Sequence, residues 1–212
     1  MPSTRAVFLD ALGTLLELEP PWAHLRRALG DDIPEERLVA AVRAEMGYYK
    51  EHSHEGRDPE SLAGLRARSA AVLSEALGRA VEVETLMEAV RFRAFPDARP
   101  ALDALGALGV ERVCVSNWDC ALPDVLERTG LAPLVDGVVT SASAGARKPD
   151  PAIFAPALAL AGCAPEDALH VGDTAEEDVE AARAAGIRAL LIDREGGGDI
   201  ASLTEIEEHL GP

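Results

Sequence analysis

Short apolar runs alternate with longer amphipathic segments along the chain, and this pattern predicts its fold class. The apolar runs, three or four residues long, have the length and composition of buried strands. Segments with helical periodicity separate them, which is typical of a parallel sheet covered by helices on both faces. We therefore expect an α/β fold with five strands, at residues 6–9, 112–115, 138–140, 168–171 and 189–192.

A second region, residues 17–93, has helical periodicity throughout. Prolines mark its first three helix starts, and glycines mark two helix ends. Four helices are expected, from Pro20-Pro21 to Gly30, over 35–54, from Asp58-Pro59 to Gly78, and over 84–93. The pattern thus predicts an α/β core domain of residues 1–16 and 94–212, with an all-helical domain of residues 17–93 inserted into it.

Composition and charge narrow the range of partners. The chain has 212 residues, of which 48% are hydrophobic, enough for a sizeable core. Its formal net charge is −17 and no basic cluster stands out, which argues against a nucleic-acid partner and against a surface for anionic lipid. No apolar run approaches the roughly 18 to 20 residues that span a bilayer, and no signal-peptide pattern precedes the first strand. We expect a cytoplasmic protein with a small, anionic substrate and no membrane partner; the pattern predicts no particular oligomeric state.

Polar residues of particular kinds follow three of the expected strands. They are Asp10, Ser116 with Asn117, and Asp173, with Asp178 five residues later and Lys148 before a helix. Because ligands bind at the carboxyl edge of open α/β sheets, we expect these residues to line one crevice. It would hold a carboxylate nucleophile, groups that bind anionic oxygens, a fixed cation and acids for a divalent ion, a set that suits phosphoryl transfer. For Asp10 by itself, a carboxylate that caps a turn is the structural alternative.

The same residues resemble the four motifs of the haloacid dehalogenase-like (HAD) hydrolase superfamily, in the same order. The motifs here are Asp10-Ala-Leu-Gly-Thr14-Leu, Ser116-Asn117, Lys148-Pro149-Asp150-Pro151 with Ile153-Phe154, and Gly172-Asp173-Thr174 through Asp178. The resemblance covers nearly the full length, and four motifs in register are more specific than any one of them. It implies a Rossmann-like core, with residues 17–93 as a helical cap over the site.

In the phosphatase branch of that superfamily, the resemblance assigns roles to five of these residues. Asp10 would be the nucleophile, and Lys148 would neutralise developing charge and keep Asp10 ionised. Thr14 would orient the loop that follows Asp10. Ser116 and the Asn117 region would bind the oxygens of the transferring group.

The resemblance also implies Mg²⁺ as a cofactor. Its ligands would be the Asp10 carboxylate, the backbone carbonyl of Leu12 and the Asp173 carboxylate, with Asp178 aiding directly or through water. The ion would neutralise phosphate charge, which would otherwise repel a carboxylate nucleophile.

One departure from the superfamily pattern leaves three functions open. Phosphatases of the superfamily usually carry a second aspartate two residues after the nucleophile, which protonates the leaving group and then activates water. Here that residue is Leu12, and a leucine cannot perform acid–base chemistry. The first hypothesis is a Mg²⁺-dependent phosphatase of a small phosphorylated metabolite, in which a cap residue, water or a good leaving group compensates.

The other two hypotheses need no proton donor at Leu12. The second is an enzyme similar to the 2-haloacid dehalogenases, in which Asp10 displaces halide and Arg43 and Tyr49 of the cap hold the substrate carboxylate and line the halide pocket. Asp173 argues against it, because a metal-free dehalogenase has little use for a metal-binding acid. The third is a non-catalytic relative that binds a ligand or a partner. The first is favoured because it gives all the catalytic and metal-binding side chains a use.

Overall fold

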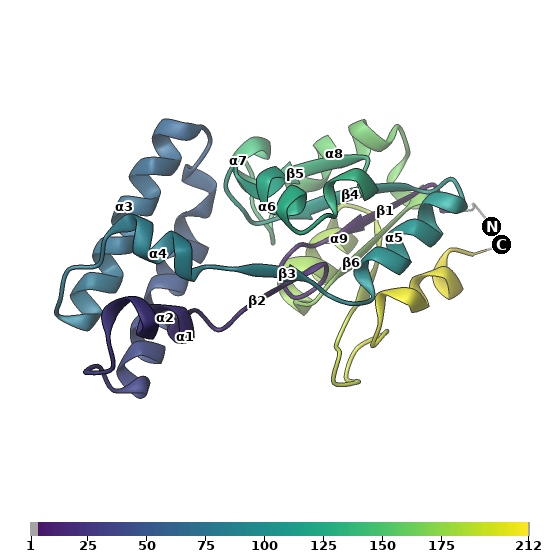
Figure 1. Ribbon diagram of the computed structural model, residues 1–212. Helices are drawn as coiled ribbons and strands as arrows, with labels where there is room; N and C mark the ends of the chain where they lie inside the picture. Colours follow the sequence, from purple (N-terminus) through teal and green to yellow (C-terminus); the bar gives the residue numbers. More distant parts are fainter. Residues whose placement is uncertain (1–3, 212) are drawn as a thin grey trace.

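The computed structural model describes residues 4–211, and its centre is a five-stranded parallel sheet (Figure 1). The strand order is β5-β4-β1-β6-β7, so the first strand of the chain lies in the middle of the sheet. All four pairings are parallel. The strands are β1 (Ala6–Leu9), β4 (Glu111–Ser116), β5 (Gly137–Thr140), β6 (Ala168–Gly172) and β7 (Arg188–Leu191). The α/β prediction is confirmed.

Helices cover both faces of the sheet, and the alternation of side chains along β1 explains why. Val7 and Leu9 belong to one apolar cluster, whereas Ala6 and Phe8 belong to another. Successive residues of a strand point to opposite faces, so a strand that is apolar at every position requires cover on both sides. The covering helices are α5 (Ala98–Ala107), α6 (Leu122–Arg128) and the 3₁₀ helix Leu203–His209 on one face, and α8 (Phe154–Ala161) and α9 (Ala181–Ala184) on the other.

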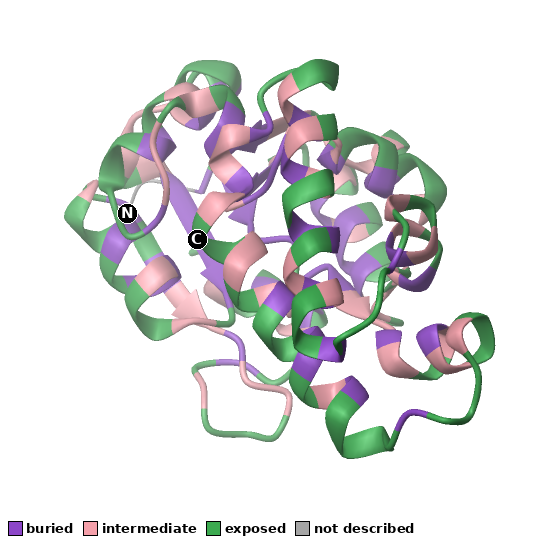
Figure 2. Cartoon of the chain, turned by 90° about the vertical axis from the view of Figure 1, so that its left-hand side faces the viewer, coloured by how far each residue is buried: buried purple, intermediate pink, exposed green. Residues whose placement is uncertain are grey.

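Four helices lie apart from the sheet, between strands β2 (Leu16–Leu18) and β3 (Phe92–Ala94) (Figure 1). They are α1 (Pro21–Leu29), α2 (Glu35–His52), α3 (Pro59–Leu77) and α4 (Val83–Ala89). Their buried faces form a separate apolar cluster that includes Leu25, Leu38 and Leu73. In Figure 2, buried positions are interspersed among exposed ones along the helices. The four predicted helices are therefore present in this segment.

The predicted end of the fourth helix was wrong. The helix expected over 84–93 ends at Ala89, and Phe92–Ala94 instead pairs antiparallel with Leu16–Leu18. Residues 92–94 alternate in character, so Phe92 packs on the apolar cluster of the core while Arg93 forms an ion pair with Glu17 on the neighbouring strand at 2.7 Å. The segment between the first two motifs is thus joined to the sheet by a two-stranded ribbon and is not entirely helical.

The helical segment between β6 and β7 is not a regular α-helix throughout. A π-helical turn, Ala175–Glu180, precedes α9, and Asp178 lies within it. The remaining short elements are α7 (Ser141–Ala144) and the 3₁₀ turns Ser53–Glu55, Ala132–Leu134, Pro151–Ile153 and Pro165–Asp167. Within residues 4–211, no helix has the length and apolar character that crossing a membrane requires.

Candidate active site

The carboxyl edge of the sheet opens into a cavity of about 960 Å³ that also reaches the four helices outside the sheet. Asp10 follows β1, Ser116 ends β4, and Asp173 follows β6. Because these three strands are neighbours in a parallel sheet, their ends meet at one place. All three residues line the cavity, together with Leu12, Asn117, Lys148 and Asp178.

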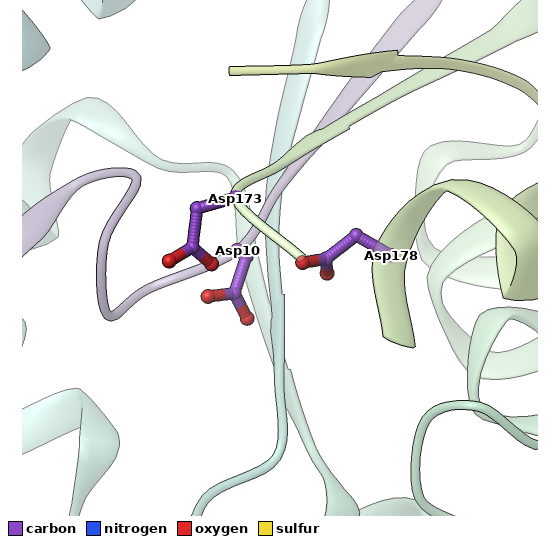
Figure 3. A group of neighbouring side chains, drawn as sticks. All are labelled: Asp10, Asp173 and Asp178. Atoms are coloured by element: carbon purple, nitrogen blue, oxygen red, sulfur yellow. The ribbon is translucent and has the colours of Figure 1, made fainter. Parts of the chain in front are cut away.

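Three carboxylates gather at this edge (Figure 3). Asp10, Asp173 and Asp178 each offer an oxygen, and these oxygens lie within 4.8 Å of one another. Asp10 and Asp178 are buried, whereas Asp173 is exposed to the cavity. Carboxylate oxygens at this spacing match the ligands that hard divalent cations prefer. The arrangement can therefore hold a metal ion.

Lys148 lies between two of these carboxylates. Its Nζ atom donates to Asp10 Oδ1 at 2.6 Å, to Asp178 Oδ1 at 2.5 Å and to the carbonyl of Val115 at 3.1 Å. The lysine is 2% exposed, so burial by itself would lower its pKa, but Asp10 and Asp178 raise the pKa above the ordinary value for lysine. Lys148 is thus a fixed cation. Lys148 contacts two of the three carboxyls and supplies one positive charge, so a divalent cation would balance the charge of three carboxylates.

The two carboxyls bonded to Lys148 are shifted in opposite directions. Burial raises the pKa of Asp10 from 3.8 to about 6, although Lys148 opposes the shift. Burial also acts to raise the pKa of Asp178, but Lys148 and His170 together hold it well below its usual range. His170 Nε2 lies 3.0 Å from Asp178 Oδ1, and the Thr174 backbone N–H donates to Asp178 Oδ2 at 3.0 Å. Asp178 is therefore the permanent counter-ion of Lys148.

Two glycines make room for these carboxylates. A Cβ atom on Gly13 would lie 2.0 Å from Asp173 Oδ2, and Gly13 also has a φ of +87°, a left-handed conformation that favours glycine. A Cβ atom on Gly172 would lie 2.1 Å from the Asp178 carboxyl carbon. Glycine at both positions is required for the carboxylates to approach the backbone so closely.

Ser116 and Asn117 both line the cavity, but they are held differently. The Asn117 side chain accepts a hydrogen bond from the Lys148 backbone N–H at 2.8 Å and donates one to the Lys148 carbonyl at 2.9 Å. These bonds fix the lysine backbone beside the strand end. Ser116 is buried at the end of β4, next to the cavity. The phosphate-binding role of the Ser116-Asn117 motif stays a prediction.

The loop after Asp10 contains two residues to which the sequence assigned roles. Thr14 is fully buried, its hydroxyl has no hydrogen-bond partner within residues 4–211, and its carbonyl accepts from Arg194 Nη2 at 2.8 Å. Leu12 is 37% exposed and lines the cavity. A hydrocarbon side chain thus occupies the position at which a phosphatase of the superfamily would carry its second aspartate.

The two cap residues of the dehalogenase hypothesis are not brought together. Arg43 is exposed on α2 and lies outside the cavity lining. Tyr49 lines the cavity, but its hydroxyl donates to Asp119 Oδ2 of the core at 2.8 Å. Burial and the Asp119 charge raise the pKa of the Tyr49 hydroxyl, which remains a donor at neutral pH. Roles for Arg43 and Tyr49 in substrate binding stay predictions.

The sequence analysis missed three polar residues of the cavity region. Glu45 and Ser69 are buried on α2 and α3, and Asp119 is buried after β4. Glu45 has a visible signal, because it continues the apolar face of α2 at the helical spacing of Leu38 and Val42. Ser69 has the same signal on α3, where it lies four residues from both Leu65 and Leu73, whereas the burial of Asp119 depends on the path of the loop after β4.

Comparison with known protein families shows to which family this chain belongs. The model of one family, described as haloacid dehalogenase-like hydrolase, matches residues 4–186. The chain belongs to the haloacid dehalogenase-like hydrolases. The resemblance inferred from the four motifs is thereby confirmed, and the motif residues are those that the structure brings to one cavity.

Curated relatives of this HAD-like hydrolase match part of it. Haloacid dehalogenase-like hydrolase domain-containing protein 3 of Xenopus laevis is 43% identical over 97 residues, 46% of this chain and 40% of that protein. A phosphoserine phosphatase of Thermus thermophilus is 36% identical over 131 residues, 58% of this chain and 51% of that protein. The chain thus spans about half the length of these relatives, or less.

Solved structures match nearly the whole chain. A HAD phosphatase from Thermococcus onnurineus has a TM-score of 0.70 at 25% identity and covers 98% of both chains. A 2-haloacid dehalogenase from Pseudomonas syringae has a TM-score of 0.66 at 24% identity, again with 98% coverage of both chains. Phosphatases and dehalogenases therefore share the fold of this HAD-like hydrolase.

Proposed function

We propose that this HAD-like hydrolase is a Mg²⁺-dependent phosphatase that acts on a small phosphorylated metabolite through an aspartyl-phosphate intermediate on Asp10. One observation carries the proposal. A carboxylate oxygen of Asp10 lies within 4.8 Å of one oxygen each of Asp173 and Asp178, so the nucleophile belongs to a set of candidate oxygen ligands. An enzyme that displaces halide needs the nucleophile but has little use for a metal-binding acid such as Asp173. The phosphoserine phosphatase of Thermus thermophilus among the relatives supports the same choice.

The metal ion would be held by the carboxylates of Asp10, Asp173 and Asp178, with the backbone carbonyl of Leu12 as a further ligand. When bound, Mg²⁺ neutralises phosphate charge and so permits attack by a carboxylate. The charge balance supports this assignment, because Lys148 is the cation that contacts two of the three carboxyls and none of the ion pairs among the described residues involves Asp173.

The chemistry that we propose has two displacements at phosphorus. A carboxylate oxygen of Asp10 forms a bond to phosphorus while the bond to the leaving oxygen breaks, and the departing alkoxide takes up a proton. Water then attacks phosphorus, which releases inorganic phosphate and restores the Asp10 carboxylate. Lys148 stabilises the charge that develops beside Asp10. Ser116 and the Asn117 region bind the phosphoryl oxygens, and the Asn117 side chain also holds the lysine backbone. Thr14 orients the loop after Asp10.

Leu12 leaves the protonation of the leaving group without a donor at this position. Because it carries no proton, protonation of the leaving group comes from a cap residue or from water, or it becomes unnecessary when the leaving group is already weakly basic. Aryl phosphates should therefore be better substrates than alkyl phosphates of similar size.

A second candidate function, 2-haloacid dehalogenation, is favoured by the same residue. Displacement of halide by Asp10 requires no proton donor, so Leu12 would be no handicap, and its exposed side chain would add to the apolar lining of the cavity. Asp173 weighs against this function, and Arg43 lies outside the cavity lining.

Phosphate release and halide release distinguish the two functions. We would measure Mg²⁺-dependent phosphate release from an aryl phosphate and a panel of phosphometabolites, and halide release from 2-haloacids, with wild-type protein and Asp10→Asn side by side. Phosphate release that requires both Mg²⁺ and Asp10 is expected. Halide release without metal would replace the proposal with the dehalogenase, and silence in both assays would support a binding role.

A further inference from the structure

A carboxyl group lies buried in the part of the cavity wall that belongs to α2. Glu45 is 6% exposed and lines the cavity, and it occupies the helix face that carries Leu38 and Val42. The cavity lining from α2, from α4 and from the residue after α4 includes the apolar Val42, Met46, Leu86, Met87 and Val90, besides the polar Tyr49, Lys50 and Glu88. Acidic side chains are almost never buried among apolar neighbours unless they have a partner.

Glu45 has no charged partner among residues 4–211. None of the ion pairs and none of the side-chain hydrogen bonds in this part of the chain joins its carboxyl to a cation. Burial therefore raises the pKa of Glu45, and the Ser69 hydroxyl offsets part of this rise. Burial of the Glu45 carboxylate costs desolvation free energy, which a cationic ligand would offset.

The second polar group of this wall is Ser69, which comes from α3. It is 1% exposed and lines the same cavity, and its hydroxyl lies close enough to the Glu45 carboxyl to lower the pKa of that group, although it makes no hydrogen bond of ordinary geometry within residues 4–211. A buried hydroxyl without a partner is unusual and costly. Glu45 and Ser69 are therefore neighbouring polar groups, from two different helices, that can bind the same ligand.

We propose that Glu45 and Ser69 form a subsite for an ammonium group on the leaving group of the substrate. Asp10 and Glu45 line one continuous cavity, so a molecule whose phosphate lies at Asp10 can extend to α2. This inference rests on the proposed function, and it narrows the substrate class to phosphate monoesters of amino alcohols, with an apolar stretch between the two charged ends. A carboxylate in an apolar wall binds an ammonium ion strongly because little water competes for either group.

The test is a binding measurement with ligands that cannot be hydrolysed. Calorimetry with Mg²⁺ present would compare ω-aminoalkyl phosphonates with alkyl phosphonates of equal length, over a series of chain lengths. At the length that spans the cavity, the amino ligand is expected to bind at least about ten-fold more tightly, which corresponds to about 1.4 kcal/mol. Glu45→Gln should abolish that preference, and Ser69→Ala should reduce it.

Glu88→Gln is the matched control, because Glu88 lines the same cavity but is exposed. This variant should keep the preference for the amino ligand. Equal binding of the two series by the wild-type protein overturns the subsite, as does a preference that survives in both Glu45→Gln and Ser69→Ala. Equal weakening of both ligands in Glu45→Gln would instead assign Glu45 a structural role, and thermal unfolding of each variant shows whether it is folded.

The two proposals fail in different ways. A preference for the amino ligand without phosphate release from the corresponding aminoalkyl phosphate contradicts the phosphatase and leaves the subsite standing. Phosphate release from alkyl and aminoalkyl phosphates at equal kcat/KM, together with equal binding of the phosphonates, contradicts the subsite and leaves the phosphatase standing. If no phosphonate of either series binds and neither phosphate series releases phosphate, both proposals are wrong.

Discussion

Asp10 and Asp178 share one ammonium group, yet the pKa values of their carboxyls move in opposite directions. Asp178 has His170 and a backbone N–H as further partners. Burial raises the pKa of Asp10, and Lys148 offsets only part of that rise. In the metal-free protein the raised pKa of Asp10 is therefore a cost of ionising it inside the fold. A bound cation would remove this cost by favouring the carboxylate.

The first prediction concerns stability and pH in the metal-free protein. Because the pKa of Asp10 rises from 3.8 to about 6 on folding, the folded state holds this proton more tightly, and the associated stability is lost as the pH rises through that interval. Asp10→Asn lacks this loss, so its stability relative to wild type should improve between pH 4 and pH 7 by on the order of 2 kcal/mol. Urea unfolding in the presence of a chelator measures the difference; a pH-independent difference would contradict the shift.

The second prediction concerns Lys148. Lys148→Met removes the ammonium but keeps most of the volume, which leaves Asp10 and Asp178 buried beside each other without a cation. Loss of one partner from a buried ion pair typically costs about 3–5 kcal/mol. Urea unfolding at pH 7 should detect this loss, and Lys50→Met is a control because Lys50 forms a half-exposed ion pair with Glu177 that should contribute at most about 1 kcal/mol. Equal effects of the two substitutions would argue against a buried charge centre.

Among single residues, the sequence predicted those that lie at strand ends, because a strand end is visible in the hydrophobic pattern. Asp10, Ser116 and Asp173 are of this kind, and the structure brings them to one cavity. Glu45 and Ser69 lie on the apolar faces of their helices, so their burial has a local signal, whereas the burial of Asp119 depends on the path of a loop, which no local pattern records. The hydrogen bonds of Asn117 to the Lys148 backbone were unexpected for the same reason.

Among the elements, the turn between β1 and β2 is where backbone conformation and site geometry depend on each other. Gly13 has positive φ, and a Cβ atom there would collide with Asp173. We predict that Gly13→Ala destabilises the protein by more than the roughly 1 kcal/mol of backbone strain alone and weakens binding of Mg²⁺.

Gly145→Ala is the matched control for that substitution, because Gly145 also has positive φ and a Cβ atom there would meet no atom within 4 Å. Thermal unfolding with and without Mg²⁺ should give a loss of metal-induced stabilisation in Gly13→Ala alone. If the two variants behave alike, Gly13 serves the turn only and not the carboxylate site.

The ribbon of β2 and β3 shows a limit of prediction at the scale of elements. Each strand has only three residues, too short for a reliable alternation, and β3 directly follows a helix with a similar composition. Its identity as a strand comes from pairing with Leu16–Leu18, 74 to 78 residues away. The ribbon, rather than a helix, therefore connects the helical segment to the sheet.

In the whole molecule, contacts between the helical segment and the core cluster at the end of α2. Tyr49 donates to Asp119, Lys50 pairs with Glu177 at 3.0 Å, and Arg147 donates to the Lys50 carbonyl at 3.1 Å. These contacts lie at the edge of the cavity that contains the carboxylates. The hypothesis that residues 17–93 act as a cap gains a physical basis from them, although its exact domain boundaries stay a prediction.

The proposed metal site depends on the whole molecule, because its candidate ligands come from both ends of the sequence. Mg²⁺ at about 100 times its dissociation constant should stabilise the protein by about 2.7 kcal/mol, which raises Tm by several degrees. Asp173→Asn should lose most of this gain, since Asp173 offers its oxygen to the same cluster as Asp10 and Asp178. Unchanged melting of the wild-type protein over a wide range of Mg²⁺ concentrations would count against the metal site.

The most direct test of the central claim is to trap the phosphorylated enzyme. The protein at a concentration above that of an aryl phosphate would be mixed with Mg²⁺, quenched in acid within one turnover, digested and mapped by mass spectrometry. The account predicts a phosphoryl group on the peptide that contains Asp10, absent from Asp10→Asn and from protein treated with a chelator. Phosphate release by Asp10→Asn at the wild-type rate, or a phosphoryl group on a different residue, would contradict it.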